Sequence, residues 1–269
     1  MSSNPVDSGI DNTLTSRYEC KYLINEKTAA GIRRYLSTHA SLDPFSARRE
    51  DHRYRVISLY LDSQGLRLYQ DTAQGLRNRF KLRLRYYDET GDGPVFMEVK
   101  KRSDVIVRKS RELVSRDRAN NFLLTGNFDL EDRHGEDLRE FLQRCRDADA
   151  WPALRLRYWR EAWESRGVDP VRITFDTEVE HCCLSDRGLS ESHPDWVVTP
   201  LSPKVILEVK FTDLRPHWLN LMLHMFQLDK ISVAKYAESI EHIEACGGRR
   251  ALEASMSLAQ WHRSERSAN

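Results

Sequence analysis

The chain has 269 residues, of which 40% are hydrophobic and 31% are charged, with 42 Lys and Arg against 41 Asp and Glu. This composition excludes a disordered or collagen-like chain, and no stretch approaches the ~18 consecutive apolar residues of a membrane-spanning helix. The balanced total hides a bias, because 32 of the basic residues are Arg and only 10 are Lys. Arg binds carboxylate and phosphate groups through two hydrogen bonds at once, so the composition permits a local site for an anion.

The cysteines and the two ends of the chain indicate its compartment and domain organisation. The five Cys residues are odd in number and form no CxxC pair, which argues against disulfides and a thiolate zinc site and favours a reducing compartment. Residues 1–15 are polar and are predicted to form a flexible leader, residues 16–247 a single domain, and residues 248–269 a helical or disordered tail. We therefore expect a cytoplasmic protein without direct membrane insertion.

Short runs of alternating apolar and charged residues recur along the chain and predict about eight strands. In chain order they span residues 17–23, 55–61, 79–87, 95–101, 105–114, 154–159, 171–179 and 205–211. Helices are expected after caps at Asn25 and at Asp62 or Ser63, and near residues 131–146 and 213–228. Because these helices do not alternate one for one with the strands, the pattern favours an α+β fold with a large antiparallel sheet.

Charged residues occupy alternate positions in six of the predicted strands. Since successive side chains of a strand point to opposite faces, Lys81, Arg83 and Arg85 are expected to share one face of their strand. The other charged faces are predicted to carry Glu19 and Lys21, Glu98 and Lys100, Arg155 and Arg157, Arg172, Asp176 and Glu178, and Glu208 and Lys210. A solvated sheet face would account for any one of these strands, but six such faces together are unusual.

The charged faces are expected to turn inward if helices cover the apolar faces of the sheet. Closure of the strands into a barrel with a polar interior would then also satisfy the edge strands. Many basic side chains in a confined space require a polyanionic ligand, and interleaved carboxylates suit a divalent cation bound with it. A polyphosphate group together with Mg²⁺ or Mn²⁺ meets both requirements.

Nine segments carry a resemblance to a known family. They are RYECKYLI at 17–24, VISLYLDSQGLRLYQD at 56–71, RFKLRLRYY at 79–87, VFMEVKKR at 95–102, IVRKSRE at 106–112, PALRLRYWREAW at 152–163, VRITFDTEVE at 171–180, VILEVKF at 205–211 and ISVAKYAESI at 231–240. In this order they resemble the VTC-type polyphosphate polymerase domain of the triphosphate tunnel metalloenzymes, also called CYTH-like, over about residues 16 to 245. The resemblance implies an eight-stranded antiparallel closed β-barrel, the triphosphate tunnel, with helices packed outside.

The same resemblance implies a phosphoryl transferase that extends inorganic polyphosphate from the γ-phosphate of ATP, with Mn²⁺ or Mg²⁺ as cofactor. The residues expected to bind ATP and polyphosphate or triphosphate are Lys21, Arg83, Arg85, Lys100, Lys109, Arg155, Arg157, Arg172 and Lys210. Lys235 would lie near the transferred phosphate, and the metal would be held principally by Glu208, with Glu98, Glu178 and Glu19 as further ligands. The sequence contains no P-loop and no GxGxxG, so side chains must bind the nucleotide.

The sequence leaves other functions open. Arg17 stands where the broader superfamily often has the first Glu of ExExK, and Ser232 where the polymerase type is expected to have a second basic residue before Lys235. A triphosphatase acting on inorganic or nucleoside triphosphate, or a binding protein for polyphosphate or nucleotide without turnover, therefore remains as an alternative. Nucleic-acid binding is disfavoured, because the interleaved carboxylates would repel its backbone. The resemblance also implies a membrane-embedded partner that would hold the protein at the inner face of a membrane.

Overall fold

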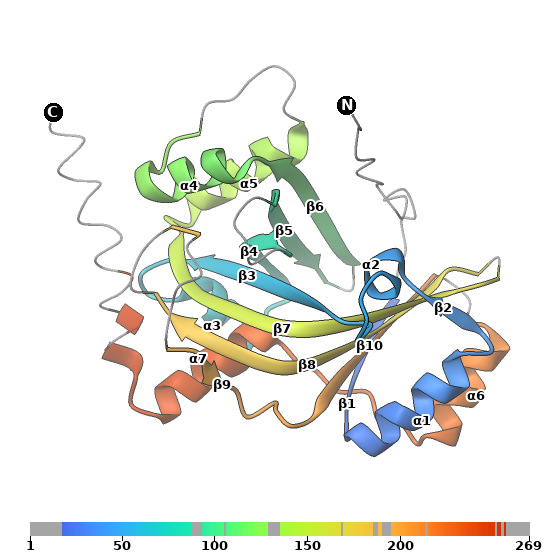
Figure 1. The fold of residues 1–269 in the computed structure, drawn as a ribbon. Coiled ribbons are helices and arrows are strands. Elements are labelled where there is room, and N and C mark those ends of the chain that lie inside the picture. The colour runs from blue at the N-terminus through green and yellow to red at the C-terminus, as the bar shows by residue number, and fades with distance from the viewer. Residues whose placement is uncertain are drawn as a thin grey trace, which may run out of the picture.

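The computed structural model describes residues 18–87, 93–104, 106–128, 135–167, 169–184, 188–189, 195–212, 215–250, 252–253 and 256. Within these residues the chain forms one antiparallel sheet with helices packed against it (Figure 1). The antiparallel α+β class predicted from the sequence is therefore confirmed. The predicted leader at 1–15 and most of the predicted tail at 248–269 lie outside the described residues.

Ten strands form the sheet, and eight of them follow the order β1-β10-β8-β7-β3-β4-β5-β6. The strands are β1 (Tyr18–Ile24), β2 (Ala40–Leu42), β3 (Tyr54–Asp62), β4 (Asn78–Tyr86), β5 (Val95–Ser103), β6 (Ile106–Val114), β7 (Trp151–Ser165), β8 (Val171–Cys183), β9 (Val197–Val198) and β10 (Val205–Phe211). β2 pairs with β7 and β9 with β8, and both are too short for a recognisable alternation of side chains. The eight strands predicted from the sequence correspond to the longer ones.

The predicted closure of the sheet into an eight-stranded barrel is wrong. In the described part of the chain no strand pairing joins β1 to β6, the two ends of the strand order. Both edges bind other groups instead. The backbone N–H of Ile231 donates to the carbonyl of Lys21 on β1 at 2.8 Å, and the backbone N–H of Arg111 on β6 donates to the carboxylate of Asp137 at 2.9 Å. These bonds satisfy edge groups that barrel closure would otherwise pair.

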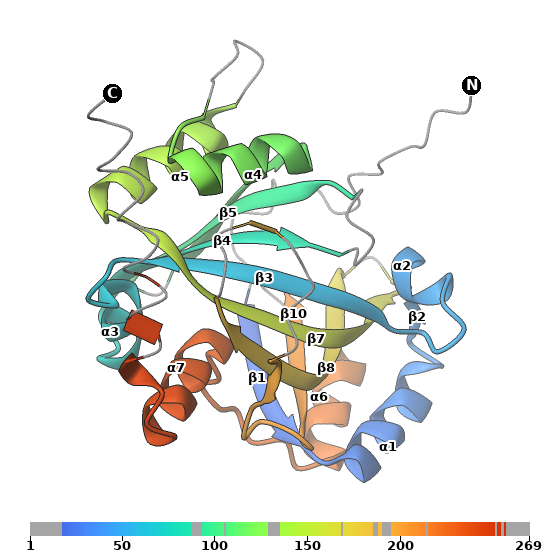
Figure 2. The same cartoon turned by 60° about the vertical axis from the view of Figure 1, so that its left-hand side comes forward.

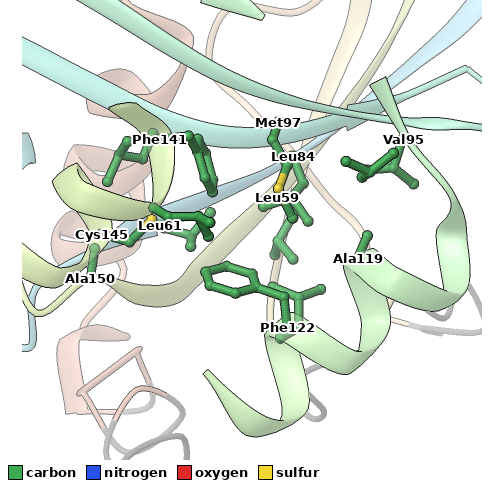
Figure 3. Close-up of a cluster of buried hydrophobic side chains, with 14 of the residues drawn as sticks. Leu59, Leu61, Leu84, Val95, Met97, Ala119, Phe122, Phe141, Cys145 and Ala150 are labelled. Atoms are coloured by element: carbon green, nitrogen blue, oxygen red, sulfur yellow. The ribbon is translucent and has the colours of Figure 1, made fainter. Parts of the chain in front are cut away.

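Two pairs of helices cover the outer face of the sheet. α4 (Arg116–Thr125) and α5 (Glu136–Asp147) pack on β3 to β6, and α1 (Glu26–Leu36) and α6 (His217–Met225) share a core with β1, β8 and β10. Figure 3 shows the first core, in which Phe122 of α4 and Phe141 of α5 gather with Leu59, Leu84 and Met97 of the strands. Burial of such side chains contributes about 1.5–3 kcal/mol each, so these cores hold the sheet in its curved form.

The remaining helices are α2 (Pro44–Ala47), α3 (Arg67–Ala73) and α7 (Lys235–Ala245). Figure 2 shows α7 on the side of β3 and β7 that faces away from α4 and α5. There Tyr236 and Ile240 share a core with Tyr60, Leu154 and Leu156. No helix in the described ranges has both the length and the apolar character needed to cross a bilayer.

The fully buried carboxylate of Asp62 joins β3, α3 and α7. It accepts hydrogen bonds from the backbone N–H groups of Ser63 at 2.7 Å, Leu68 at 2.8 Å and Tyr69 at 2.9 Å, and from the Tyr236 hydroxyl at 2.8 Å. Burial raises the pKa of Asp62, while these four donors act in the opposite direction. Asp62 therefore connects α7 to β3 and α3 in addition to the hydrophobic core that α7 shares with the sheet.

We predict that Asp62→Ala lowers the free energy of unfolding by about 3 kcal/mol, because it leaves buried donors without an acceptor. Asp62→Asn keeps one acceptor oxygen and should lose clearly less. Urea denaturation of the two variants and the wild type measures the difference. Equal stability of all three proteins would contradict the structural role of Asp62.

Candidate functional site

The side chains of β4 and β5 divide between two faces of the sheet. One set is fully buried beneath α4 and α5, namely Leu82, Leu84, Tyr86, Met97 and Val99. The alternate side chains therefore project to the opposite face, which we call the inner face: Lys81, Arg83, Arg85, Glu98 and Lys100. The inner face of this part of the sheet is thus predominantly basic, as the alternation in the sequence indicates.

A second part of the inner face comes from β1, β10 and β8. Here the core beneath α1 and α6 takes Tyr22, Leu207, Val209, Ile173 and Phe175. The alternate side chains are Glu19, Lys21, Glu208, Lys210, Thr174 and Asp176. The ammonium of Lys100 on β5 lies 3.0 Å from the carboxylate of Glu19 on β1, although these strands are far apart in the strand order. The sheet therefore curves until its two charged parts face each other without closing.

These contacts define one group of charged side chains, which we call the inner-face cluster. Its basic members are Lys21, Lys81, Arg83, Arg85, Lys100, Lys109, Arg111, Arg160, Lys210 and Lys235, and its acidic members are Glu19, Glu98, Asp176 and Glu208. Basic side chains clearly outnumber acidic ones. Confined cations in excess of their counter-ions favour a bound anion with several negative charges.

Glu98 at the centre of β5 is surrounded by cations. Its fully buried carboxylate lies 2.7 Å from Arg83, 2.7 Å from Lys109 and 3.5 Å from Arg111. Burial raises the pKa of Glu98, but the charges of Arg83, Arg85 and Lys109 outweigh burial and hold the pKa well below its usual range. The Glu98 carboxylate therefore positions basic side chains of β4 and β6.

Asp176 on β8 also positions basic side chains, one of them at the N-terminus of α7. It accepts two hydrogen bonds from Arg160, at 2.7 and 2.8 Å, and one from the ammonium of Lys235 at 2.6 Å. Burial raises the pKa of Asp176, yet Arg160 and Lys235 lower it to about 2. The Lys235 ammonium also lies 4.6 Å from the centre of the Tyr158 ring, so both contacts fix its position on the inner face.

Glu19 and Glu208 form the remaining acidic pair, on the neighbouring strands β1 and β10. In the register Glu208 lies opposite Lys21 and Glu19 opposite Lys210, so the two carboxylates are diagonal neighbours. Burial and the charge of Glu208 raise the pKa of Glu19, but Lys100, Lys210 and Lys21 lower it to about 2. Burial also raises the pKa of Glu208, which its lysine neighbours and Arg160 bring well below the usual range. Both side chains are therefore carboxylates at neutral pH.

The donor set of this pair fits a divalent cation. Mg²⁺ and Mn²⁺ prefer hard oxygen ligands, and Mg²⁺ is commonly held by one or two carboxylates together with phosphate oxygens and water. Among the described residues, no group of three or more His, Cys, Asp and Glu side chains forms a complete cage for a metal. Glu19 and Glu208 therefore suit a metal that arrives with a phosphate ligand.

Three groups of the inner face have pKa values close to physiological pH. Burial lowers the pKa of Lys81 to about 8 and that of Lys109 to about 7, in each case helped by neighbouring cations. Burial raises the pKa of the Tyr60 phenol, but Arg83, Arg85 and Lys81 outweigh it and lower that pKa to about 8. An anion bound beside Lys81 and Lys109 would restore their full charge.

The sequence predicts Arg155 and Arg157 on the charged inward face, and the structure corrects this placement. Arg155 lies opposite Leu59, and Arg157 opposite Ile57, in the pairing of β7 with β3. Those partners belong to the outer core, so both arginines project outward. Arg157 donates to Glu180 at 2.6 Å, which balances its charge there. Neither residue contributes to the inner-face cluster.

Two other predicted site residues lie at the margin of the inner face or away from it. Arg172 donates to Asp43 at 2.7 Å and also bonds Glu164, so its charge is already paired. Glu178, a predicted metal ligand, has a φ of 51° and an exposed side chain that accepts from Arg53 at 3.0 Å. This left-handed residue interrupts the alternation of β8 and turns Glu178 away from Glu208.

The structure adds residues to the site that were not predicted as ligands: Tyr60, Lys81, Arg111, Tyr158, Arg160 and Asp176. Lys81, Arg111 and Asp176 each stand at an even spacing from a predicted site residue on the same strand. The alternation in the sequence therefore already placed these three side chains on the inner face. Arg160 follows two residues after Tyr158, whose hydroxyl accepts from Arg85 at 3.3 Å. Only the register of β7 shows that these two side chains point inward.

The inner face of this curved antiparallel sheet holds an excess of cations and a pair of carboxylates, an arrangement suited to a polyanion. The family model described as the VTC domain matches residues 16–243, and the chain belongs to this family. An adenylate cyclase candidate from Bacillus halodurans is similar in structure, with 12% identity, 81% of this chain and 95% of that chain covered, and a TM-score of 0.46. The PH1819 protein from Pyrococcus horikoshii has 12% identity, 84% and 98% coverage, and a TM-score of 0.43. No curated protein matches the chain.

Arg85 and Arg157 both stand in an LRLRY segment but lie on opposite faces of the sheet, so they provide a test of the site. We predict that Arg85→Gln weakens binding of inorganic tripolyphosphate about tenfold or more, because a charged hydrogen-bond donor is lost from the inner face. Arg157→Gln should leave this affinity unchanged, since Arg157 projects outward. Isothermal titration calorimetry measures both. Equal losses in the two variants would contradict the assignment of faces in β7.

We further predict that affinity for tripolyphosphate falls as the pH rises from about 7 to about 9. Over this interval Lys81 loses its positive charge and Tyr60 gains a negative one, since both pKa values lie at about 8. In Lys81→Arg the charge at this position persists, because the guanidinium stays protonated. The same titrations should therefore show a weaker pH dependence in Lys81→Arg, and an unchanged dependence would argue against the role of Lys81.

Proposed function

We propose that the protein is a metal-dependent phosphoryl transferase that extends inorganic polyphosphate from the γ-phosphate of ATP on the inner face of its sheet. The observation that carries this proposal is the excess of basic side chains on two facing parts of one sheet. Membership of the VTC domain family supports it. A chain of phosphates has one negative charge or more on each unit, which the spaced cations can meet one after another.

The basic side chains of β4, β5 and β6 are assigned to the phosphates. Arg83 and Arg85 offer guanidinium groups from β4, while Lys100 and Lys109 offer ammonium groups on side chains that are 32% and 39% exposed. Glu98 spaces Arg83 and Lys109 by binding both. These cations would hold the donor and the acceptor in line and neutralise the charge that develops during transfer.

The reaction then requires no protein nucleophile. A terminal phosphate oxygen of the acceptor attacks the γ-phosphorus, the bond from that phosphorus to its bridging oxygen breaks, and ADP leaves. Lys235, held by Asp176 at 2.6 Å, would present its ammonium to the transferring group. Glu19 and Glu208 would hold Mg²⁺ or Mn²⁺, which supplies further charge neutralisation at the phosphates when bound.

We predict that Glu208→Gln and Lys235→Met each reduce chain synthesis about a hundredfold or more, because each removes a charge placed for the transferring phosphate. Glu178→Gln is the matched control, since Glu178 is exposed and outside the inner-face cluster. The assay incubates purified protein with ATP and Mn²⁺ or Mg²⁺, with and without a short polyphosphate primer, and resolves the products on a gel.

Long chains made by the wild type and by Glu178→Gln, and lost in the other two variants, would support the transferase. Free phosphate without chains, still dependent on Glu208, would instead identify a triphosphatase. Tight binding of tripolyphosphate without any turnover would leave a binding protein as the function.

A further inference from the structure

Aromatic rings form a continuous series at the end of the inner face where β3 begins. The ring centroids of Phe45 on α2 and Tyr54 on β3 are 5.9 Å apart, those of Tyr54 and Tyr87 6.0 Å, and those of Tyr87 and Phe96 on β5 5.9 Å. Tyr87 directly follows β4. The series therefore crosses from α2 to β5 over one end of the inner face.

The inner end of this series lies among the cations assigned to phosphate. Phe96 pairs with Arg85 in the register of β4 and β5, and the guanidinium of Arg111 lies 3.4 Å from the centre of the Phe96 ring. Tyr54 pairs with Arg160 in the register of β3 and β7. A ligand that reached these cations with its phosphates would thus carry its remaining part past the rings.

The outer end of the series is open to solvent. The side chain of Phe45 is 59% exposed and belongs to none of the hydrophobic cores described above, whereas Tyr54 is 6% exposed. The successive rings meet at 52°, 62° and 73°, so in each pair the edge of one ring lies against the face of the next. Phe45 ends the series and contacts only Tyr54 within it, so much of its ring is open to solvent.

The opposite end of the inner face has a different character. Arg79 and Arg102 lie opposite each other there, and burial together with the charge of Arg102 lowers the pKa of Arg79. Two of the rings at that end, Tyr60 and Tyr236, are buried and stack on one another at 4.7 Å, so one face of each is occupied. The paired arginines there suit further phosphates.

We propose that Phe45 and Tyr87 form a binding site for the nucleobase of a nucleoside triphosphate, whose phosphates reach Arg85 and Arg111. Every base has a flat π face, so stacking on such rings binds a nucleoside without requiring one particular base. The identification of the ligand as the nucleotide donor rests on the proposed function. The site would give ATP an advantage over inorganic tripolyphosphate, which has no base.

The test compares these two ligands in the absence of added divalent metal, where turnover does not remove them. We expect Phe45→Ala to weaken ATP binding about tenfold and to leave tripolyphosphate binding unchanged, measured by isothermal titration calorimetry. Phe45→Trp should retain the affinity for ATP, since it keeps a ring face. Leu221→Ala, at an exposed apolar side chain of α6, which covers the outer face of the sheet, is the matched control and should change neither affinity.

Equal losses for ATP and tripolyphosphate in Phe45→Ala, or no loss for ATP, would overturn the nucleobase site. Selective loss of ATP affinity in a protein that makes no polyphosphate would refute the transfer reaction and support the site. Binding of tripolyphosphate without any binding of ATP by the wild type would refute both the site and the nucleotide donor.

Discussion

Repulsion between confined cations is the constraint on which the rest of this structure depends. Lysines and arginines from β1, β4, β5, β6, β7, β10 and α7 project to one face of the sheet. Three of the carboxylates contact two cations or more: Glu98 contacts Arg83 and Lys109, Asp176 contacts Arg160 and Lys235, and Glu19 contacts Lys21 and Lys100. The carboxylates offset part of this repulsion, but they leave an excess of positive charge that a polyanion can satisfy.

The two parts of the charged inner face meet although the sheet is open. Side chains, and not a strand pairing, connect the two ends of the strand order. Lys100 reaches from β5 to Glu19 on β1, while Ile231 and Asp137 occupy backbone groups at the two edges. An ion pair between partly exposed side chains is weaker than a strand pairing, so the outer helical cores must supply most of the stability. Packing on the outer face of the sheet therefore stabilises the strands that present the site on the inner face.

Alternation in the sequence predicted the inner face of β1, β4, β5 and β10 because each of these strands has one face in a hydrophobic core. The prediction failed on β7, where both faces are buried. The alternation of leucine and arginine in this strand therefore does not show which face is the inner one. There the register with β3 sends Arg155 outward and Arg160 inward. It failed again at Glu178, where a left-handed residue shifts the alternation of β8. The local sequence pattern shows neither the register of β7 with β3 nor the left-handed backbone of Glu178.

The sequence by itself determined the antiparallel α+β class, the charged inner faces of four strands, and the family through the order of its nine segments. These follow from local alternation and residue type, which each strand expresses on its own. Only the tertiary structure decided that the sheet stays open, that Asp176 holds Lys235 beside Arg160, and that Phe45, Tyr54, Tyr87 and Phe96 meet at one end. Such contacts join residues far apart in the chain, and they depend on strand register and on how far the sheet curves.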